Sequence, residues 1–239
     1  MDISVSYYTA KGKRQNNEDT ASLLEGNNSL LAIVADGLGG HEDGEIASNH
    51  AVATMNRILQ SRQPDEDELA DAIRQANQEI YQMQNSQKHM RTTVAALWLG
   101  DHRTIAAHVG DSRIYQFRDG RIVYQSTDHS VAQMAVLVGE LEKDEIRYSK
   151  DRNKLIRVVG DANPPKVDSV ELTIQAADRF LLCSDGFWEP LTEEFMIEAM
   201  ANSTTAQQWL SLMRQEVERV NNPSQDNHTA IALIVNELI

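Results

Sequence analysis

The stretch Leu30–Ala35 reads LLAIVA and runs directly into Asp36. A short, continuously apolar run is typical of a strand that is buried on both faces. A carboxylate at the end of such a strand costs several kcal/mol when it is desolvated without a partner, so Asp36 requires a neutralising group. Three other aspartates flank apolar runs: Asp185 follows RFLLCS, Asp111 follows TIAAHVG, and Asp226 precedes TAIALIV. Each alone is most often a turn or cap residue, but four in one chain favour a shared site.

These aspartates would form an all-oxygen cluster if the strand ends converge. Carboxylates, carbonyls and water select Mg²⁺ or Mn²⁺, and the histidines and the single cysteine lack the spacing of a zinc site. Two such ions about 3.5–4 Å apart can activate water for in-line attack on phosphorus. An EF-hand is the alternative for an acidic loop with glycine. However, Leu38 and Gly40 occupy the third and fifth positions counted from Asp36 and cannot ligate through side chains.

The composition restricts the class of protein. The chain has 239 residues, 41% of them hydrophobic, and a formal net charge of −14. This length suits one domain over residues 1–239, with a core that needs no disulfide. The acidic balance argues against binding to nucleic acid or to an anionic membrane, because phosphate contacts need lysine and arginine. The chain has a single cysteine, no apolar core of a signal peptide and no apolar run of about 18 residues. These features predict a soluble cytoplasmic protein.

Hydrophobic periodicity predicts helices in two pairs and strands linked by hairpins. The helices are expected over residues 44–62, 67–84, 192–201 and 204–220. The strands after LLAIVA are expected over residues 92–99, 104–109, 112–117, 121–125, 167–174, 179–184 and 229–235. Asp119-Gly120 predicts a hairpin turn, and strands 167–174 and 179–184 are expected to pair with each other. The pattern indicates antiparallel sheets covered by helices, with residues 132–159 as an excursion from the main body.

Arg14, in the stretch KGKRQNNEDT, is the candidate cation for a phosphate. The guanidinium presents a planar fork of donors that matches two phosphate oxygens, which lysine cannot do. The alternative is that Lys11, Lys13 and Arg14 form a solvated basic patch.

A cysteine-based phosphatase mechanism is disfavoured. It needs arginine six positions after the cysteine, and Glu189 stands six positions after Cys183. Cys183 also lies within a strand pattern, so we expect it to be an inert core thiol.

At this point the chain resembles the metal-dependent protein phosphatases of the PP2C type, and in particular their short bacterial branch. Its motifs occur in the family's order over about 215 of the 239 residues. They are Arg14-x-x-x-Glu18-Asp19, Val34-Ala-Asp36-Gly37-Leu38-Gly39-Gly40-His41, Thr92-Thr93, Val109-Gly110-Asp111-Ser112-Arg113, Asp128-His129, Ser184-Asp185-Gly186-Phe187-Trp188 and Asp226-Asn227-His228-Thr229.

The resemblance implies an α+β fold: a four-layer α-β-β-α sandwich of two antiparallel sheets flanked by helical pairs. It implies Mn²⁺ or Mg²⁺ as cofactor, with two core ions and a weaker third, and a flap at residues 132–159. The implied roles follow the motifs. Asp36 would bridge the two core metals, and the Gly37 carbonyl would bind one of them. Asp185 and Asp226 would complete the shell of the other core metal, and Asp111 with Asp185 would hold the third ion. Arg14 would bind the phosphate, and the assisting residues would be Glu18, Asp19 and Glu189.

The function implied is hydrolysis of phosphoserine and phosphothreonine in proteins by a metal-bridged hydroxide, with Asp36 and Arg14 as catalytic residues. The expected partners are phosphorylated proteins, including a bacterial Ser/Thr kinase or its targets, and the expected state is a monomer. Leu38 departs from the histidine that eukaryotic members often carry there as a proposed general acid. The alternatives are a degenerate phosphatase fold that acts as a binding or signalling module and a sensory phosphatase for a small substrate.

Overall fold

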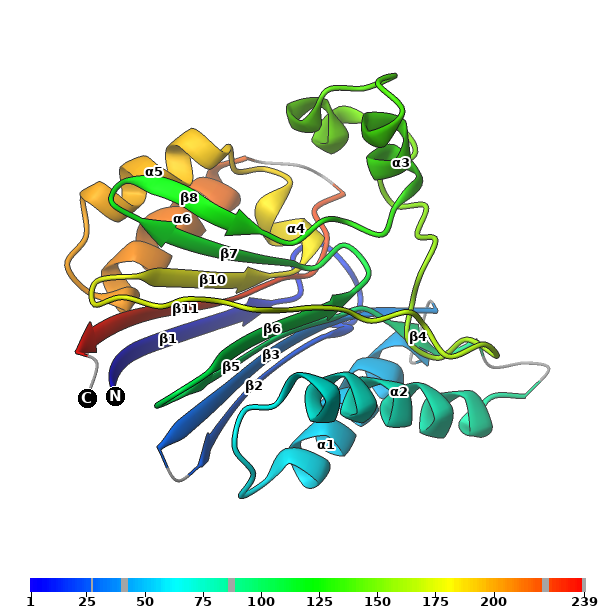
Figure 1. Ribbon diagram of the computed structural model, residues 1–239. Helices are drawn as coiled ribbons and strands as arrows, with labels where there is room; N and C mark the ends of the chain where they lie inside the picture. Colours follow the sequence, from blue (N-terminus) through cyan, green and yellow to red (C-terminus); the bar gives the residue numbers. More distant parts are fainter. Residues whose placement is uncertain (27, 40–42, 86–88, 221–223, 238–239) are drawn as a thin grey trace.

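Two antiparallel β-sheets, stacked face to face, form the centre of the computed structural model (Figure 1). The model describes residues 1–26, 28–39, 43–85, 89–220 and 224–237. The first sheet contains, in spatial order, β1 (Asp2–Ala10), β11 (His228–Glu237), β10 (Arg179–Cys183), β7 (Arg113–Arg118) and β8 (Arg121–Gln125). The second contains β2 (Asp19–Gly26), β3 (Ser29–Leu38), β5 (Val94–Gly100), β6 (Thr104–Val109) and β9 (Asp168–Glu171), with the short β4 (Arg91–Thr92) paired to the end of β3.

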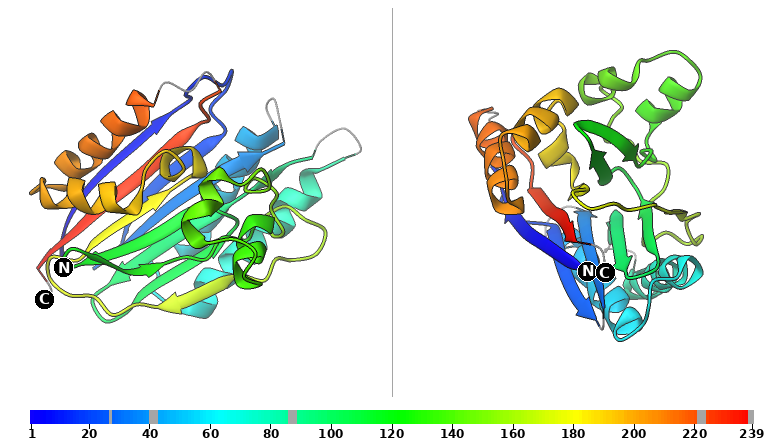
Figure 2. Two further views of the ribbon diagram at one scale, coloured as in Figure 1. Left: turned by 90° about the horizontal axis from the view of Figure 1, so that it is seen from above. Right: turned by 60° about the vertical axis from the view of Figure 1, so that its left-hand side comes forward.

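A pair of helices covers the outer face of each sheet (Figures 1 and 2). The helices α1 (Asp43–Leu59) and α2 (Glu66–Met83) pack on the second sheet, and α5 (Glu193–Ala201) and α6 (Ala206–Arg219) pack on the first. This order confirms the predicted four-layer α-β-β-α sandwich.

The run LLAIVA lies in β3, and its burial explains its continuous apolar character. Leu31 and Ile33 belong to the core between the second sheet and its helices. Ala32 and Val34 belong to the core between the two sheets. Because successive side chains of a strand point to opposite faces, a strand in an inner layer must be apolar at every position.

The hairpin predicted at Asp119-Gly120 is confirmed. β7 pairs with β8, and both turn residues have positive φ, 50° for Asp119 and 73° for Gly120. These are left-handed backbone conformations that aspartate and glycine adopt more readily than most residues.

The predicted pairing of strands 167–174 and 179–184 is wrong. β9 pairs with β6 in the second sheet, whereas β10 pairs with β7 and β11 in the first. The segment between them crosses from one sheet to the other, and Gln116 and Arg118 of β7 donate hydrogen bonds to the carbonyl of Thr173 within it, each over 2.9 Å. A short polar connection has the same sequence pattern whether the chain folds back in one sheet or changes sheets.

Three other differences concern the strands. The edge strand β2 and the edge strand β1 were not predicted, because most of their side chains are only partly buried and their apolar pattern is weak. β3 does not end at Asp36 but continues to Leu38. The strand predicted over 92–99 breaks at Thr93, whose N–H donates to the Asp36 carbonyl over 2.8 Å while its hydroxyl accepts from the Asp36 N–H.

Residues 132–155 stand beside one end of the sheets (Figure 1), whereas the end of the predicted excursion returns to the sandwich, where Val159 pairs with Thr92 and joins the core of the second sheet. Residues 132–155 contain most of α3 (Val131–Leu137) and the 3₁₀ helix η1 (Lys143–Tyr148). Backbone hydrogen bonds close the base of this excursion segment, from Val131 N–H to the Lys154 carbonyl and from Ile156 N–H to the His129 carbonyl, both over 2.8 Å.

Candidate active site

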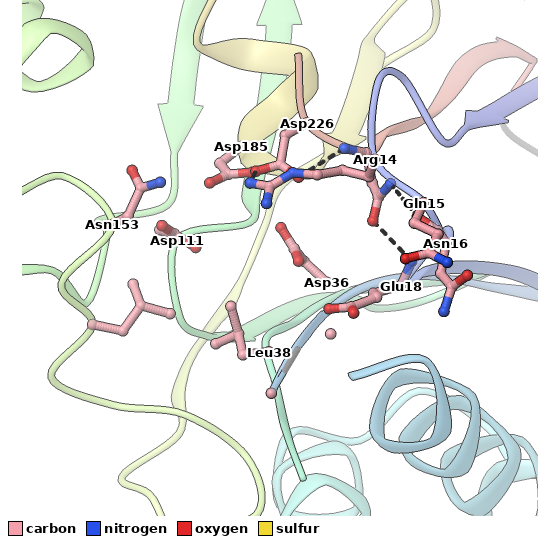
Figure 3. A pocket seen from close by; sticks show the side chains of 14 residues that line it. Arg14, Gln15, Asn16, Glu18, Asp36, Leu38, Asp111, Asn153, Asp185 and Asp226 are labelled. Atoms are coloured by element: carbon pink, nitrogen blue, oxygen red, sulfur yellow. Dashed lines mark hydrogen bonds and ion pairs between the residues drawn. The ribbon is translucent and has the colours of Figure 1, made fainter. Parts of the chain in front are cut away.

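The four aspartates singled out in the sequence meet in one cavity at an end of the two sheets (Figure 3). Asp36 comes from β3, Asp111 from the turn between β6 and β7, and Asp226 from the loop before β11. Asp185 is the first residue of α4 (Asp185–Trp188), directly after β10. The cavity has a volume of about 390 Å³. Four aspartates at or near the strand ends of both sheets thus converge, as a shared site requires.

Two further charged residues of the predicted set line the same cavity, and two do not. Arg14 and Glu18 lie on its wall with the aspartates. Asp19 lies beside Asp36, its partner in the β2–β3 register, and accepts a hydrogen bond from the Ser184 hydroxyl over 2.7 Å. Glu189 lines a neighbouring groove instead. Gly40 and His41 of the predicted glycine-rich motif lie outside the described residues.

Burial and mutual repulsion raise the pKa values of this carboxylate cluster. Burial, followed by the charges of neighbouring aspartates, raises the pKa of Asp36 and of Asp111 well above the usual range. Burial raises the pKa of Asp19 to about 7, and burial with the Asp226 charge raises the pKa of Asp185 to about 6. Carboxylates that repel one another in a buried site are stabilised in their charged form by a bound cation.

The donor set fits a divalent cation. One carboxylate oxygen of Asp19 is buried without a hydrogen-bond partner among the described residues. The cavity wall carries five carboxylates, one arginine and the Gly37 backbone. A side chain at Gly37 would collide with the carbonyls of Gly44 and Glu18, so only glycine lets β3 lie this close to the start of α1. Hard oxygen donors of this kind suit Mg²⁺ or Mn²⁺.

Arg14 is directed at the cluster by an ordered turn. Its guanidinium donates to Asp226 over 2.6 Å, and its side chain is 56% exposed. The Asp226 hydrogen bond raises the pKa of Arg14 further, so the group remains a cation. The contact with Asp226, a member of the aspartate cluster, goes beyond what a solvated basic patch predicts, and the exposed guanidinium can reach an anion that enters the cavity.

A match over most of the chain settles the family. Residues 9–221 match the family model described as protein phosphatase 2C. The chain belongs to the protein phosphatase 2C family.

Similar proteins support this assignment over nearly the full length of the chain. It is 28% identical to the serine/threonine phosphatase stp of Listeria monocytogenes over 99% of this chain and 97% of that protein. The solved structure of the Streptococcus agalactiae serine/threonine phosphatase superposes with a TM-score of 0.86 at 27% identity, covering 98% of this chain and 100% of that one. The catalytic domain of PstP, solved in complex with two manganese ions, gives 0.80 at 28% identity, covering 99% and 100%. The phosphatase is therefore a serine/threonine protein phosphatase, as the resemblance predicted.

A buried ion pair, whose residues were not among the predicted site residues, supports the turn that carries Asp111. Arg113 donates to both carboxylate oxygens of Asp128 over 2.8 and 2.7 Å, and its guanidinium stacks 3.4 Å from the centre of the Trp188 ring. The Trp188 indole N–H donates to the Asp111 carbonyl over 3.0 Å. The signal available in the sequence was an arginine inside the apolar strand SRIYQF, because buried arginines are paired.

A second cluster of potential ligands does not have the geometry of a metal site. Atoms of His108, His129 and Asp168 lie within 4.8 Å of one another. However, the two imidazole rings stack at 17° with centres 4.6 Å apart, so ring nitrogens in nearly parallel planes cannot converge on one ion. Arg157 also donates to Asp168 over 2.8 Å and already supplies the positive charge. We interpret this cluster as structural support for the turn before Asp111.

Cys183 takes the place expected of a core thiol. It is fully buried in β10, and burial raises its pKa far above the usual range of a thiol. A thiolate nucleophile is therefore disfavoured at this position. Within the described residues, the phosphatase has no helix that is long and apolar enough to cross a membrane.

Proposed function

We propose that the phosphatase hydrolyses phosphoserine and phosphothreonine with Mn²⁺ or Mg²⁺ held by the carboxylates around Asp36. Asp36 with the Gly37 carbonyl, Asp185 and Asp226 would hold two core ions, and Asp111 with Asp185 would hold a weaker third. The observation that carries the proposal is a wall of five carboxylates against one arginine in a single cavity. When bound, such ions act as Lewis acids on phosphoryl oxygens and lower the pKa of water to near neutrality.

The chain's own residues bind and orient the phosphate. Arg14 would exchange its contact with Asp226 for two phosphate oxygens and stabilise the charge that develops on them. Glu18, on the cavity wall, and Asp19, beside Asp36, would hold water in the metal shell by accepting hydrogen bonds. Leu38 lines the cavity and offers no proton to the leaving oxygen.

Glu189 would act from the neighbouring groove. It accepts a hydrogen bond from Arg152 over 2.7 Å, and burial together with the Asp185 charge raises its pKa to about 7. We assign it an assisting role beside the third ion.

We also propose that the substrates are cytoplasmic phosphoproteins, including a Ser/Thr kinase or its targets, and that the phosphatase acts as a monomer. The single buried cysteine suits a reducing compartment. Bacterial relatives that are named serine/threonine phosphatases favour a signalling role in which phosphate is removed from proteins.

The test is metal-dependent phosphate release from a phosphothreonine peptide, measured with Mn²⁺ and again with EDTA. We expect activity with the ion, none with the chelator, and loss of most activity in Asp36→Asn, because one charge of the bridging carboxylate is removed. Circular dichroism controls for folding of the variant. A folded wild-type protein that binds Mn²⁺ without releasing phosphate would support the degenerate binding module instead.

A further inference from the structure

A second groove opens beside the candidate active site. It has a volume of about 450 Å³ and shares Arg14, Asn153 and Asp226 with the catalytic cavity. Its other walls come from the excursion segment, the residues after α4, the C-terminal end of α6 and the loop before β11. A substrate whose phosphate is held at Arg14 therefore has this groove directly next to the phosphorylated residue.

The groove reverses the charge balance of the chain. The whole sequence has 22 Lys+Arg against 36 Asp+Glu, and the catalytic cavity has one arginine against five carboxylates. The groove, in contrast, has four cations and two carboxylates. The cations are Lys13, Arg14, Arg147 and Arg152, and the carboxylates are Glu189 and Asp226. An anion of the substrate would find complementary charge here and repulsion over most of the remaining surface.

The cations of the groove differ in their availability to a ligand. The Arg147 side chain is only 6% exposed and donates to Glu193 and to the Leu191 carbonyl, so it supports the wall. Arg152 is 34% exposed and can share its guanidinium beyond its bond to Glu189. Lys13 is exposed and forms no ion pair with any residue that the structure describes.

The backbone that carries Lys13 is held in place. Its N–H donates to the Gln225 carbonyl over 2.9 Å, and the Arg14 N–H donates to the Lys11 carbonyl over 3.1 Å. Gly12, directly before Lys13, has φ of 57°, and a side chain at this position would collide with the Asp226 carbonyl. The ammonium group is therefore presented from a fixed turn, which lowers the ordering cost of binding.

We propose that this groove, through Lys13 and Arg152, binds a second anionic group of the phosphoprotein and gives the phosphatase a preference for phosphoresidues with acidic neighbours. The inference rests on the proposed phosphate-binding role of Arg14. An extended chain advances about 3.3 Å per residue, so neighbours within about three positions reach the groove. Exposed ion pairs are weak and screened by salt, so the preference is about two- to fivefold at low salt.

The experiment compares kcat/KM for four phosphothreonine peptides that carry two glutamates or two glutamines on either the N-terminal or the C-terminal side. A fifth peptide carries a second phosphothreonine, and mass spectrometry follows the order of release, which distinguishes phosphate from carboxylate as the second anion. We expect at least one glutamate peptide to exceed its glutamine partner by about two- to fivefold in low salt and to lose this advantage at about 0.5 M salt.

Lys13→Glu should abolish or reverse the preference, and Lys11→Glu, the same charge change two positions earlier and outside both cavities, should retain it. Equal kcat/KM for all peptides in the wild type, or a preference that survives Lys13→Glu, overturns the inference. Failure of every peptide to release phosphate with Mn²⁺ is a different result and overturns the proposed function itself.

Discussion

Removing Arg113 should destabilise the phosphatase far more than removing a surface arginine. The Arg113 and Asp128 side chains are 3% and 2% exposed and share two hydrogen bonds of 2.8 and 2.7 Å. Arg113→Met keeps much of the side-chain volume but leaves the Asp128 carboxylate buried without its cation. Loss of one partner from a buried pair costs about 3–5 kcal/mol. For a chain of this length, that cost lowers Tm by about 6–20 °C.

The assay is urea unfolding followed by circular dichroism, with Arg74→Met as the matched control. Arg74 pairs with Asp71 on the surface, where the two side chains are 46% and 72% exposed, and its loss should cost under about 1 kcal/mol. The double variant Arg113→Met with Asp128→Leu should recover part of the stability, because it removes the unpaired charge. A loss below about 1 kcal/mol in Arg113→Met, or no recovery in the double variant, would refute the reasoning.

Four other predictions concern the site and its metals. Arg14→Ala should lower kcat/KM on a phosphopeptide about ten- to a hundredfold, through a lost charge-assisted contact, and unchanged kinetics would return Arg14 to a surface patch. Asp111→Ala should lower turnover sharply while calorimetry still detects the tight metal sites. A variant that binds no metal at all, or one that keeps both its metal binding and its rate, would contradict a third-ion role. Cys183→Ser should keep catalysis and lose about 1–3 kcal/mol of stability in urea unfolding, and a folded, metal-loaded but inactive variant would contradict it. In the presence of EDTA, the stability of the fold should decrease as pH rises from about 4 to about 7. The raised pKa values of Asp19 and Asp185 make the folded state bind more protons than the unfolded state in this range. Tm measured against pH should show this decrease with EDTA and no such decrease with Mn²⁺ present.

The sequence alone indicated the buried strands of the inner layers and an oxygen-rich candidate site. Leu30–Ala35 indicated a strand with two buried faces, because every position is apolar and strand side chains alternate. Asp119-Gly120 determined a hairpin, because both residues tolerate positive φ. The aspartates at the edges of apolar runs indicated an oxygen-rich site, because an unpaired carboxylate next to a buried strand is too costly.

Only the tertiary structure decided which strands meet and how charges are shared. β9 and β10 are close in sequence, yet they join different sheets, and pairing partners depend on packing that no local pattern contains. Asp19 lies beside Asp36 because β2 pairs with β3, and the β7–β8 hairpin brings Arg113 and Asp128 together in the buried interior. The basic groove beside Arg14 combines segments that are up to 213 positions apart, Lys13 and Asp226 among them. Such assemblies depend on long-range packing, because the free energy that holds them comes from burying surfaces that only the completed fold creates.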